Sequence, residues 1–126
     1  MKTQITNHKD LDLWKKSISL VKEIYSATRF FPADEKYGIV QQIRRSAISI
    51  PSNIAEGAGR TSRKEFTNFL SIAQGSLSEL ETQLIIAKEL DYVSEAESFH
   101  SQIKSIRLMI RGLINKVSND RNVATM

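Results

Sequence analysis

The sequence predicts an all-α protein, an antiparallel up-down-up-down four-helix bundle. Apolar residues recur at alternating steps of three and four through most of the 126-residue chain, which is the spacing of amphipathic helices. No segment alternates apolar and polar residues for long enough to form a strand, and 5 Gly and 2 Pro are few for a turn-rich β fold. We therefore expect one helical domain over residues 10–118, between flexible ends at residues 1–9 and 119–126.

Each predicted helix carries an apolar stripe that we expect to form the core. The first consists of Leu11, Trp14, Ile18, Val21 and Tyr25, continued by Thr28. The second consists of Val40, Ile43, Ala47, Ile50 and Ile54. The third consists of Phe66, Leu70, Ala73, Leu77, Leu80, Leu84 and Ala87. The fourth consists of Ala96, Phe99, Ile103, Ile106, Ile110, Leu113 and Val117. Stripes of this kind favour helix packing at shallow crossing angles.

Capping and breaking residues predict where the helices begin and end. Asp34 is a candidate cap for the second helix, and the glycines of residues 57–59 are expected to end it. Pro51 lies within this helix, where its ring displaces a backbone carbonyl, so a kink is expected there. Capping-box pairs open the third and fourth helices: Ser62 with Glu65, and Ser94 with Glu97. The short loops between these signals make consecutive helices antiparallel.

The first helix carries more apolar surface than one stripe requires. Leu13, Leu20 and Ile24 form a second stripe, roughly 100° around the helix from the first. This excess either widens the core face or forms a lateral surface that meets another copy of the chain. Leu13, Leu20 and Ile24 are therefore candidate oligomer-interface residues, and the third helix has a similar excess at Phe69, Ile72 and Ile86.

The second helix also has a stripe of small polar residues that includes Ser46, Ser49, Asn53 and Glu56. It is either a solvated face or a surface that pairs with a polar stripe of the third helix. In the second interpretation, hydrogen bonds cross a helix or subunit boundary. The candidate interface residues are Ser49, Asn53, Glu56, Ser76, Glu79 and Gln83.

Positive charge supports binding of an anionic partner. The net charge is +4 and the pI is about 9.5. The candidate nucleic-acid-binding residues form three sets: Arg44 and Arg45; Arg60, Arg63 and Lys64; and Lys104, Arg107 and Arg111. The second set flanks the start of a helix, where free backbone N–H groups favour a phosphate. The alternative for each set is an ordinary solvated face with intramolecular ion pairs. Base stacking is not predicted, because the aromatic residues lie mostly on the apolar stripes.

The residue types needed for catalysis are sparse. The chain has no cysteine, and its two histidines, His8 and His100, lie far apart in sequence. Glu97 and His100 form a Glu-x-x-His step, but a di-iron bundle needs two such steps. We therefore expect a non-enzymatic protein with no catalytic residue, metal or cofactor. No apolar run approaches a membrane span, and no signal peptide is visible, so a cytoplasmic location is expected.

The middle of the chain resembles a known bacterial family. The matching segments run from Ser49 to Gly57 and from Gly75 to Leu80, with further matches at Arg44 and Arg45. Together they resemble the four-helix-bundle proteins encoded in intervening sequences of 23S ribosomal RNA genes. The resemblance spans residues 10–117. The residues that match the family motif are Arg44, Arg45, Ser49, Pro51, Asn53, Glu56, Gly57, Ser76 and Glu79.

The resemblance implies a left-handed bundle that assembles into a ring of five subunits. The family is similar to the accessory variability protein of diversity-generating retroelements, a basic pentamer that engages a reverse transcriptase and nucleic acid. It supplies no catalytic residues. We therefore predict an oligomeric scaffold or accessory protein that binds RNA or DNA through a basic surface. The alternative is a protein-interaction module with no nucleic-acid role.

Overall fold

A computed structural model describes residues 8, 11–94 and 99–119, which form four α-helices and one short 3-10 helix. The elements in chain order are α1 (Asp12–Thr28), η2 (Ala33–Glu35), α2 (Ile39–Ala58), α3 (Arg63–Glu89) and α4 (His100–Asn119). The described ranges contain no strand. The all-helical fold is thereby confirmed.

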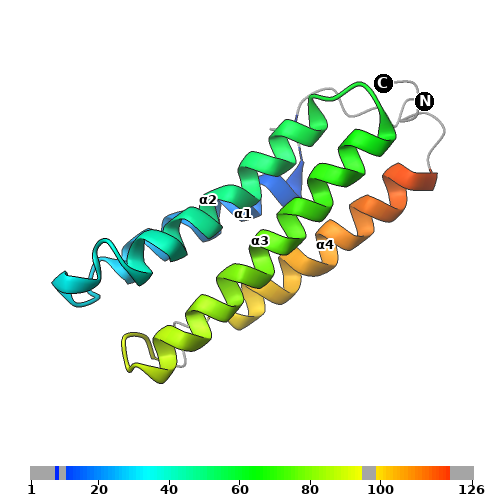
Figure 1. Ribbon diagram of the computed structural model, residues 1–126. Coiled ribbons are helices and arrows are strands. Elements are labelled where there is room, and N and C mark those ends of the chain that lie inside the picture. Colours follow the sequence, from blue (N-terminus) through cyan, green and yellow to red (C-terminus); the bar gives the residue numbers. More distant parts are fainter. Residues whose placement is uncertain (1–7, 9–10, 95–98, 120–126) are drawn as a thin grey trace.

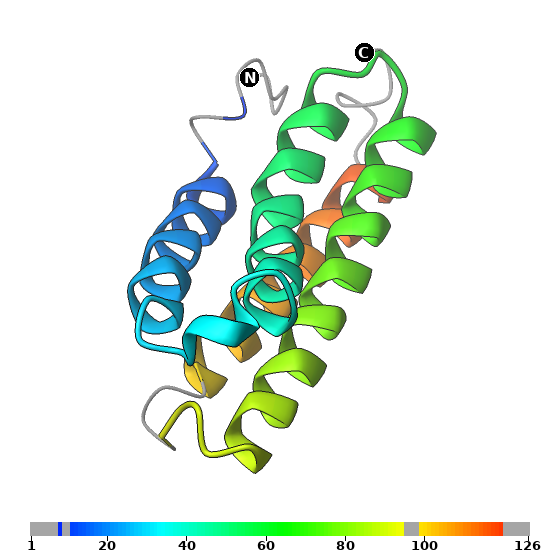
Figure 2. The same ribbon diagram turned by 60° about the vertical axis from the view of Figure 1, so that its left-hand side comes forward.

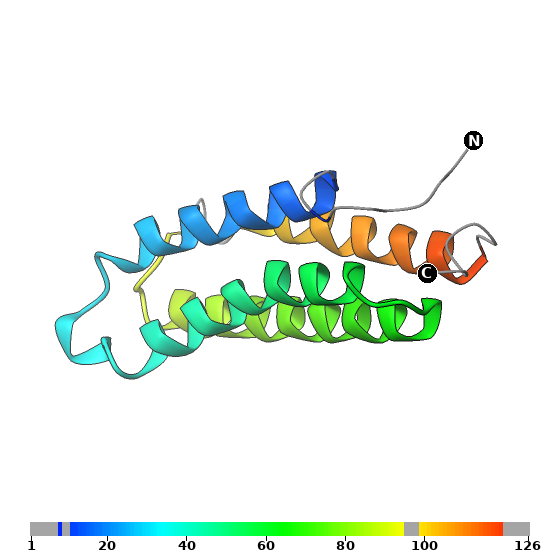
Figure 3. The same cartoon turned by 90° about the horizontal axis from the view of Figure 1, so that it is seen from above.

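The helices lie in two layers, with α2 and α3 in one and α1 and α4 in the other (Figure 3). Each helix packs against two others, in the pairs α1 with α2, α2 with α3, α3 with α4, and α1 with α4. The connection through η2, seen in cyan in Figure 2, lies at one end of the molecule, and the α2–α3 loop lies at the other (Figure 1). This arrangement is consistent with a four-helix bundle.

Three of the four predicted core stripes are buried. The predicted positions on α2 and α3 are all buried, and Phe66, Leu70 and Leu77 are fully so. On α4, Ile103, Ile106 and Ile110 are buried, whereas Leu113 is half-buried. Ala96 lies outside the described residues. The core therefore follows the predicted stripes except on α1.

On α1 the predicted core stripe is only partly correct, because Thr28 is buried but Leu11, Trp14 and Val21 are half-buried at the border of a wider core face. Leu13, Leu20 and Ile24 face the core, whereas Ile18 of the predicted stripe is 42% exposed. The buried face also includes Ser17, and its hydroxyl donates a hydrogen bond to the Trp14 carbonyl oxygen at 2.8 Å. Because this hydroxyl finds its acceptor on its own helix, the polar residue can be buried at little cost.

Thr28 behaves in the same way at the end of α1. It is buried, and its hydroxyl donates to the Ile24 carbonyl oxygen at 2.8 Å. Within one chain, Leu13, Leu20 and Ile24 thus belong to the core. Their assignment to a lateral oligomer surface is corrected accordingly.

The start of α2 differs from the prediction, and its end agrees with it. Asp34 lies in η2 and does not cap α2, which begins at Ile39 after Gly38. A Glu35 carboxylate oxygen instead accepts from the Ile39 N–H group at 3.5 Å. The helix continues through the buried Pro51 and ends at Ala58. The kink at Pro51 stays a prediction.

One of the two capping boxes opens a helix as predicted. The Ser62 hydroxyl accepts from the Glu65 N–H group at 3.1 Å, at the start of α3. The described part of α4, however, begins only at His100, because Phe99 has a φ of 59°, in the left-handed region that an α-helix cannot include. Ser94 therefore does not cap α4, and Glu97 lies outside the described residues.

The helices α2 and α3 approach most closely near the α2–α3 loop. A Cβ atom added to Gly57 would lie 2.8 Å from Phe69 Cβ and 3.2 Å from the Phe66 carbonyl oxygen. Only a glycine permits this approach. In Figure 1 the two helices separate toward the opposite end, where α2 begins. In the described residues, no helix is long and apolar enough to cross a membrane.

Candidate functional site

The polar stripe of α2 meets α3 within the same chain. The Ser49 and Ser76 hydroxyl oxygens are 2.7 Å apart and share a hydrogen bond. The Asn53 side-chain amide donates to the Ser49 carbonyl oxygen at 2.8 Å and to the Ser49 hydroxyl at 3.0 Å. The Ser49–Ser76 hydrogen bond therefore joins two helices of one subunit, while Asn53 holds Ser49 from within α2.

Beyond this contact, α2 and α3 enclose a polar groove of about 540 Å³. Its lining residues are Tyr37, Gln41, Gln42, Arg45, Ser46, Ser49, Glu79 and Gln83. Glu79 is exposed, and the Gln83 side-chain oxygen is buried without a hydrogen-bond partner. Within one chain, the Gln83 side-chain oxygen is thus left for a partner outside the described residues. Whether this surface joins subunits stays a prediction.

A second groove, of about 430 Å³, follows the other flank of α2, against α1. We call it the cationic groove, and its lining residues are Tyr25, Lys36, Tyr37, Val40, Gln41, Arg44, Arg45 and Ile48. Tyr37, Gln41 and Arg45 line both grooves and form the ridge between them. No acidic residue lines the cationic groove in the part of the chain that the structure describes.

Arg44 is held in the cationic groove by neutral groups of α1. Its Nε donates to the Thr28 hydroxyl at 2.9 Å, and one Nη donates to the Tyr25 carbonyl oxygen at 3.3 Å. Its guanidinium carbon lies 4.3 Å from the centre of the Tyr25 ring. Because none of these partners carries a negative charge, the position of Arg44 is fixed while its charge stays uncompensated.

Two of the predicted cations are neutralised by carboxylates. Arg60 pairs with Glu56 at 2.6 Å, and its guanidinium lies 4.9 Å from the Phe69 ring centre. Arg107 forms an ion pair with Glu81 on α3. At these two positions the alternative of intramolecular pairing is correct. The pairing also places Glu56, a predicted interface residue, in an ion pair with a residue just beyond the end of its own helix.

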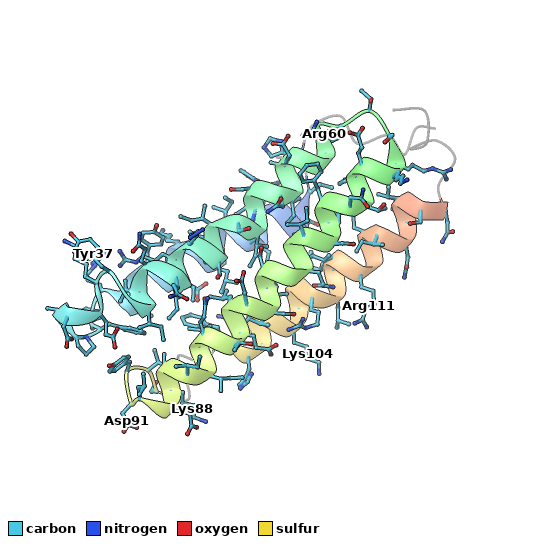
Figure 4. The ribbon with its side chains drawn as sticks, viewed as in Figure 1. Tyr37, Arg60, Lys88, Asp91, Lys104 and Arg111 are labelled. Carbon is cyan, nitrogen blue, oxygen red and sulfur yellow. The ribbon has the colours of Figure 1, made fainter. Side chains whose placement is uncertain are left out.

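The other predicted cations have no carboxylate partner in the described residues. Arg63 donates to the Ser118 carbonyl oxygen at 3.0 Å, a neutral acceptor at the end of α4. Arg45, Lys64, Lys104 and Arg111 are exposed, and none forms an ion pair within residues 8, 11–94 and 99–119. Figure 4 shows Lys104 and Arg111 projecting outward from α4, whereas Arg60 lies near the α2–α3 loop. The cations thus form separate patches.

Two aromatic residues near η2 lie off the predicted apolar stripes and are exposed. Phe30 is 83% exposed and Tyr37 is 80% exposed, at the end of the molecule where α2 begins. Their neighbour Phe31 is buried and packs against Tyr92, with ring centres 5.4 Å apart. Phe30 and Tyr37 lie between the predicted stripe that ends at Thr28 and the one that begins at Val40, and this position is the sequence signal of their exposure.

A hydrogen bond from Tyr92 links the α3–α4 connection to η2. Its hydroxyl donates to a Glu35 carboxylate oxygen at 2.8 Å. This hydrogen bond to Glu35, together with partial burial and the negative charges of Glu35 and Asp34, raises the pKa of Tyr92 above its ordinary value.

Metal-binding residues do not cluster in the described residues, where no three His, Asp or Glu side chains come together. His8 packs its ring against Trp14, with ring centres 5.0 Å apart. His100 is exposed at the first residue of α4.

Comparisons with known proteins agree with this fold. A family model described as "23S rRNA-intervening sequence protein" matches residues 9–112. The chain is similar to a crystal structure of a protein of unknown function from the S23 ribosomal protein family of Bacteroides thetaiotaomicron. That likeness has a TM-score of 0.74 and 26% sequence identity, and it covers 81% of this chain and 97% of the other. A search of curated proteins finds no match. Since the family model spans most of the chain, the protein belongs to the 23S rRNA-intervening sequence protein family.

Proposed function

We propose that this protein is a non-enzymatic, oligomeric helical scaffold that binds nucleic acid through cations on its surface. The observation that carries the proposal is the state of the eight predicted cations. Two of them, Arg60 and Arg107, pair with carboxylates, and the remaining six have no acidic partner in the described structure. Positive charge therefore remains available to phosphates.

The distribution of these cations fits sequence-independent binding. Arg63 and Lys64 lie at the first turn of α3, Lys104 and Arg111 on α4, and Arg45 on α2. Cations that contact phosphates give affinity without reading base sequence, and such binding weakens steeply with salt. A polyanion that passes over several patches would meet more charge than any one patch supplies.

Exposed apolar side chains support self-association. Ile18 on α1 and Ile48 on α2 are each 42% exposed, and Ile72 on α3 is 50% exposed. Ile18 and Ile48 line one hollow between α1 and α2, whereas Ile72 lies on α3. Contact between two unlike surfaces generates a ring where the rotation closes. We propose the ring of five subunits that the family resemblance implies, built from left-handed up-down-up-down bundles in the cytoplasm. Such a ring presents each cation five times, which raises avidity.

The second candidate is a protein-interaction module without a nucleic-acid role. It is favoured by large apolar side chains that are exposed to solvent. Phe30 is 83% exposed, Leu108 54% and Leu90 49%. Its partner would be a protein with a complementary apolar surface, such as a reverse transcriptase.

Retention on a polyanion column under rising salt separates the two candidates. We expect Lys64→Ala/Lys104→Ala/Arg111→Ala to elute at clearly lower salt than the wild type. The matched control is Lys15→Ala/Lys16→Ala/Lys22→Ala, which removes the same charge from exposed positions of α1. It should elute close to the wild type.

Two outcomes contradict the proposal. If the wild type elutes at the low salt typical of a protein that does not bind polyanions, the protein-interaction module becomes the better account. If both triple variants shift equally, net charge rather than these patches determines retention. Native mass spectrometry of the wild type tests the ring separately, with five subunits as the expected mass.

A further inference from the structure

We infer that the cationic groove between α1 and α2 binds an unpaired nucleobase of a single-stranded nucleic acid, with Tyr37 as its stacking surface. The inference rests on the proposed function and specifies the form of nucleic acid that is bound. It combines two features that the chain brings together in this groove: clustered cations and the exposed aromatic ring of Tyr37.

The charge of the groove is suited to phosphate groups. Lys36, Arg44 and Arg45 line it, and no acidic residue does so in the described structure. The nearby Glu35 carboxylate does not line the groove, and it accepts hydrogen bonds from the Tyr92 hydroxyl at 2.8 Å and from the Ile39 N–H group at 3.5 Å. Within the described residues, Lys36, Arg44 and Arg45 form no ion pair with Glu35 or with another carboxylate.

Arg44 gives the groove a preorganised charge. Its hydrogen bonds to Thr28 and Tyr25 and its stacking on the Tyr25 ring fix the guanidinium before any ligand arrives. A group that is already ordered loses less conformational entropy on binding than a free side chain does. Arg45, by contrast, is exposed on the ridge and can follow the ligand backbone.

The rings and the apolar lining are suited to a base. Tyr37 is 80% exposed, with the Lys36 ammonium 5.4 Å from its ring centre. Val40 and Ile48 also line the groove and give it apolar surface. At about 430 Å³, the groove lies within the range of small-molecule sites. Bases of single strands commonly stack on aromatic side chains and on guanidinium planes.

This geometry predicts a preference for single strands. In a duplex, each base face is covered by its neighbours, so the Tyr37 ring has no base face to stack on. In a single strand, the base faces are accessible, and stacking tolerates every base type. A single strand therefore gains binding free energy from stacking on Tyr37, in addition to the phosphate contacts that any nucleic acid can make.

Fluorescence anisotropy with a labelled oligothymidylate of about 20 nucleotides, and with a duplex of the same length, tests the inference. We expect the wild type to bind the single strand more tightly than the duplex. Tyr37→Ala should weaken single-strand binding by about fivefold to a hundredfold, as loss of a stacking aromatic does elsewhere. Tyr37→Phe should retain most of the affinity. Phe30→Ala is the matched control, because Phe30 is equally exposed but does not line the groove.

The other outcomes separate this inference from the proposed function. If Tyr37→Ala binds the single strand as tightly as the wild type does, the groove inference is wrong while phosphate binding stands. If the wild type binds neither probe, the proposed function and the inference both fail. If Tyr37→Ala instead changes the subunit number in native mass spectrometry, the groove seats a second copy of the chain and the inference is overturned.

Discussion

Substitution of Gly57 by alanine tests the close approach of α2 and α3. The added methyl group would lie 2.8 Å from Phe69 Cβ, 3.0 Å from a Phe66 ring carbon and 3.2 Å from the Phe66 carbonyl oxygen. Two of these atoms belong to the backbone or the base of a side chain, so rotation of a side chain cannot relieve the overlap. Overpacking of this kind costs about 1–3 kcal/mol. The intrinsic preference of a helix for alanine over glycine opposes it by at most about 1 kcal/mol.

Gly112→Ala is the matched control, because Gly112 is exposed within α4 and a Cβ atom there meets nothing within 4 Å. It should stabilise the protein by about 0.5–1 kcal/mol through helix propensity alone. Urea denaturation followed by circular dichroism, at one protein concentration, gives both free energies of unfolding. We expect Gly57→Ala to be the less stable variant by about 1–3 kcal/mol. Equal stability of the two variants would refute the close approach.

Three further predictions concern contacts that hold the elements together. A double-mutant cycle with Ser49→Ala and Ser76→Ala should give a coupling energy of about 1 kcal/mol in urea denaturation, and a value near zero would exclude their hydrogen bond. Ser62→Ala should destabilise the protein by about 1 kcal/mol through loss of the α3 cap, whereas unchanged stability would show that the cap is dispensable. Tyr92→Phe should lower thermal stability at neutral pH. Since the pKa of Tyr92 is raised in the fold, the hydrogen bond to Glu35 contributes fully below the unfolded value of 10.0 and is lost as the pH rises through the folded value. The difference between wild type and Tyr92→Phe should therefore shrink above pH 10, and a difference independent of pH would contradict the assignment.

The sequence predicted the core on α2 and α3 because each helix has one long apolar stripe bordered by polar residues. On α1 the prediction was only partly correct, because two neighbouring apolar stripes both contact the core there. The pattern could not show that the Ser17 hydroxyl finds its acceptor on its own helix, which allows Ser17 to be buried. The start of α4 was predicted too early, because a hydropathy pattern does not indicate that the backbone of Phe99 is left-handed.

The candidate site was predictable as a set of cations but not as a surface. The spacing of Glu56 and Arg60, four residues apart across the end of α2, could have indicated their ion pair. The pair of Arg107 with Glu81 joins two helices and needed the fold. The cationic groove also needed the fold, because Tyr25 comes from α1 while Tyr37 and Arg44 come from the start of α2 and the segment before it.

The salt dependence of oligothymidylate binding tests the central claim most directly, because it counts the phosphates that the protein contacts. The account predicts that the logarithm of the association constant falls linearly with the logarithm of salt concentration. It also predicts that Arg45→Ala makes this slope shallower by about 0.7, the contribution of one phosphate contact on a single strand. An affinity that does not change with salt, or no detectable binding at low salt, would contradict the account.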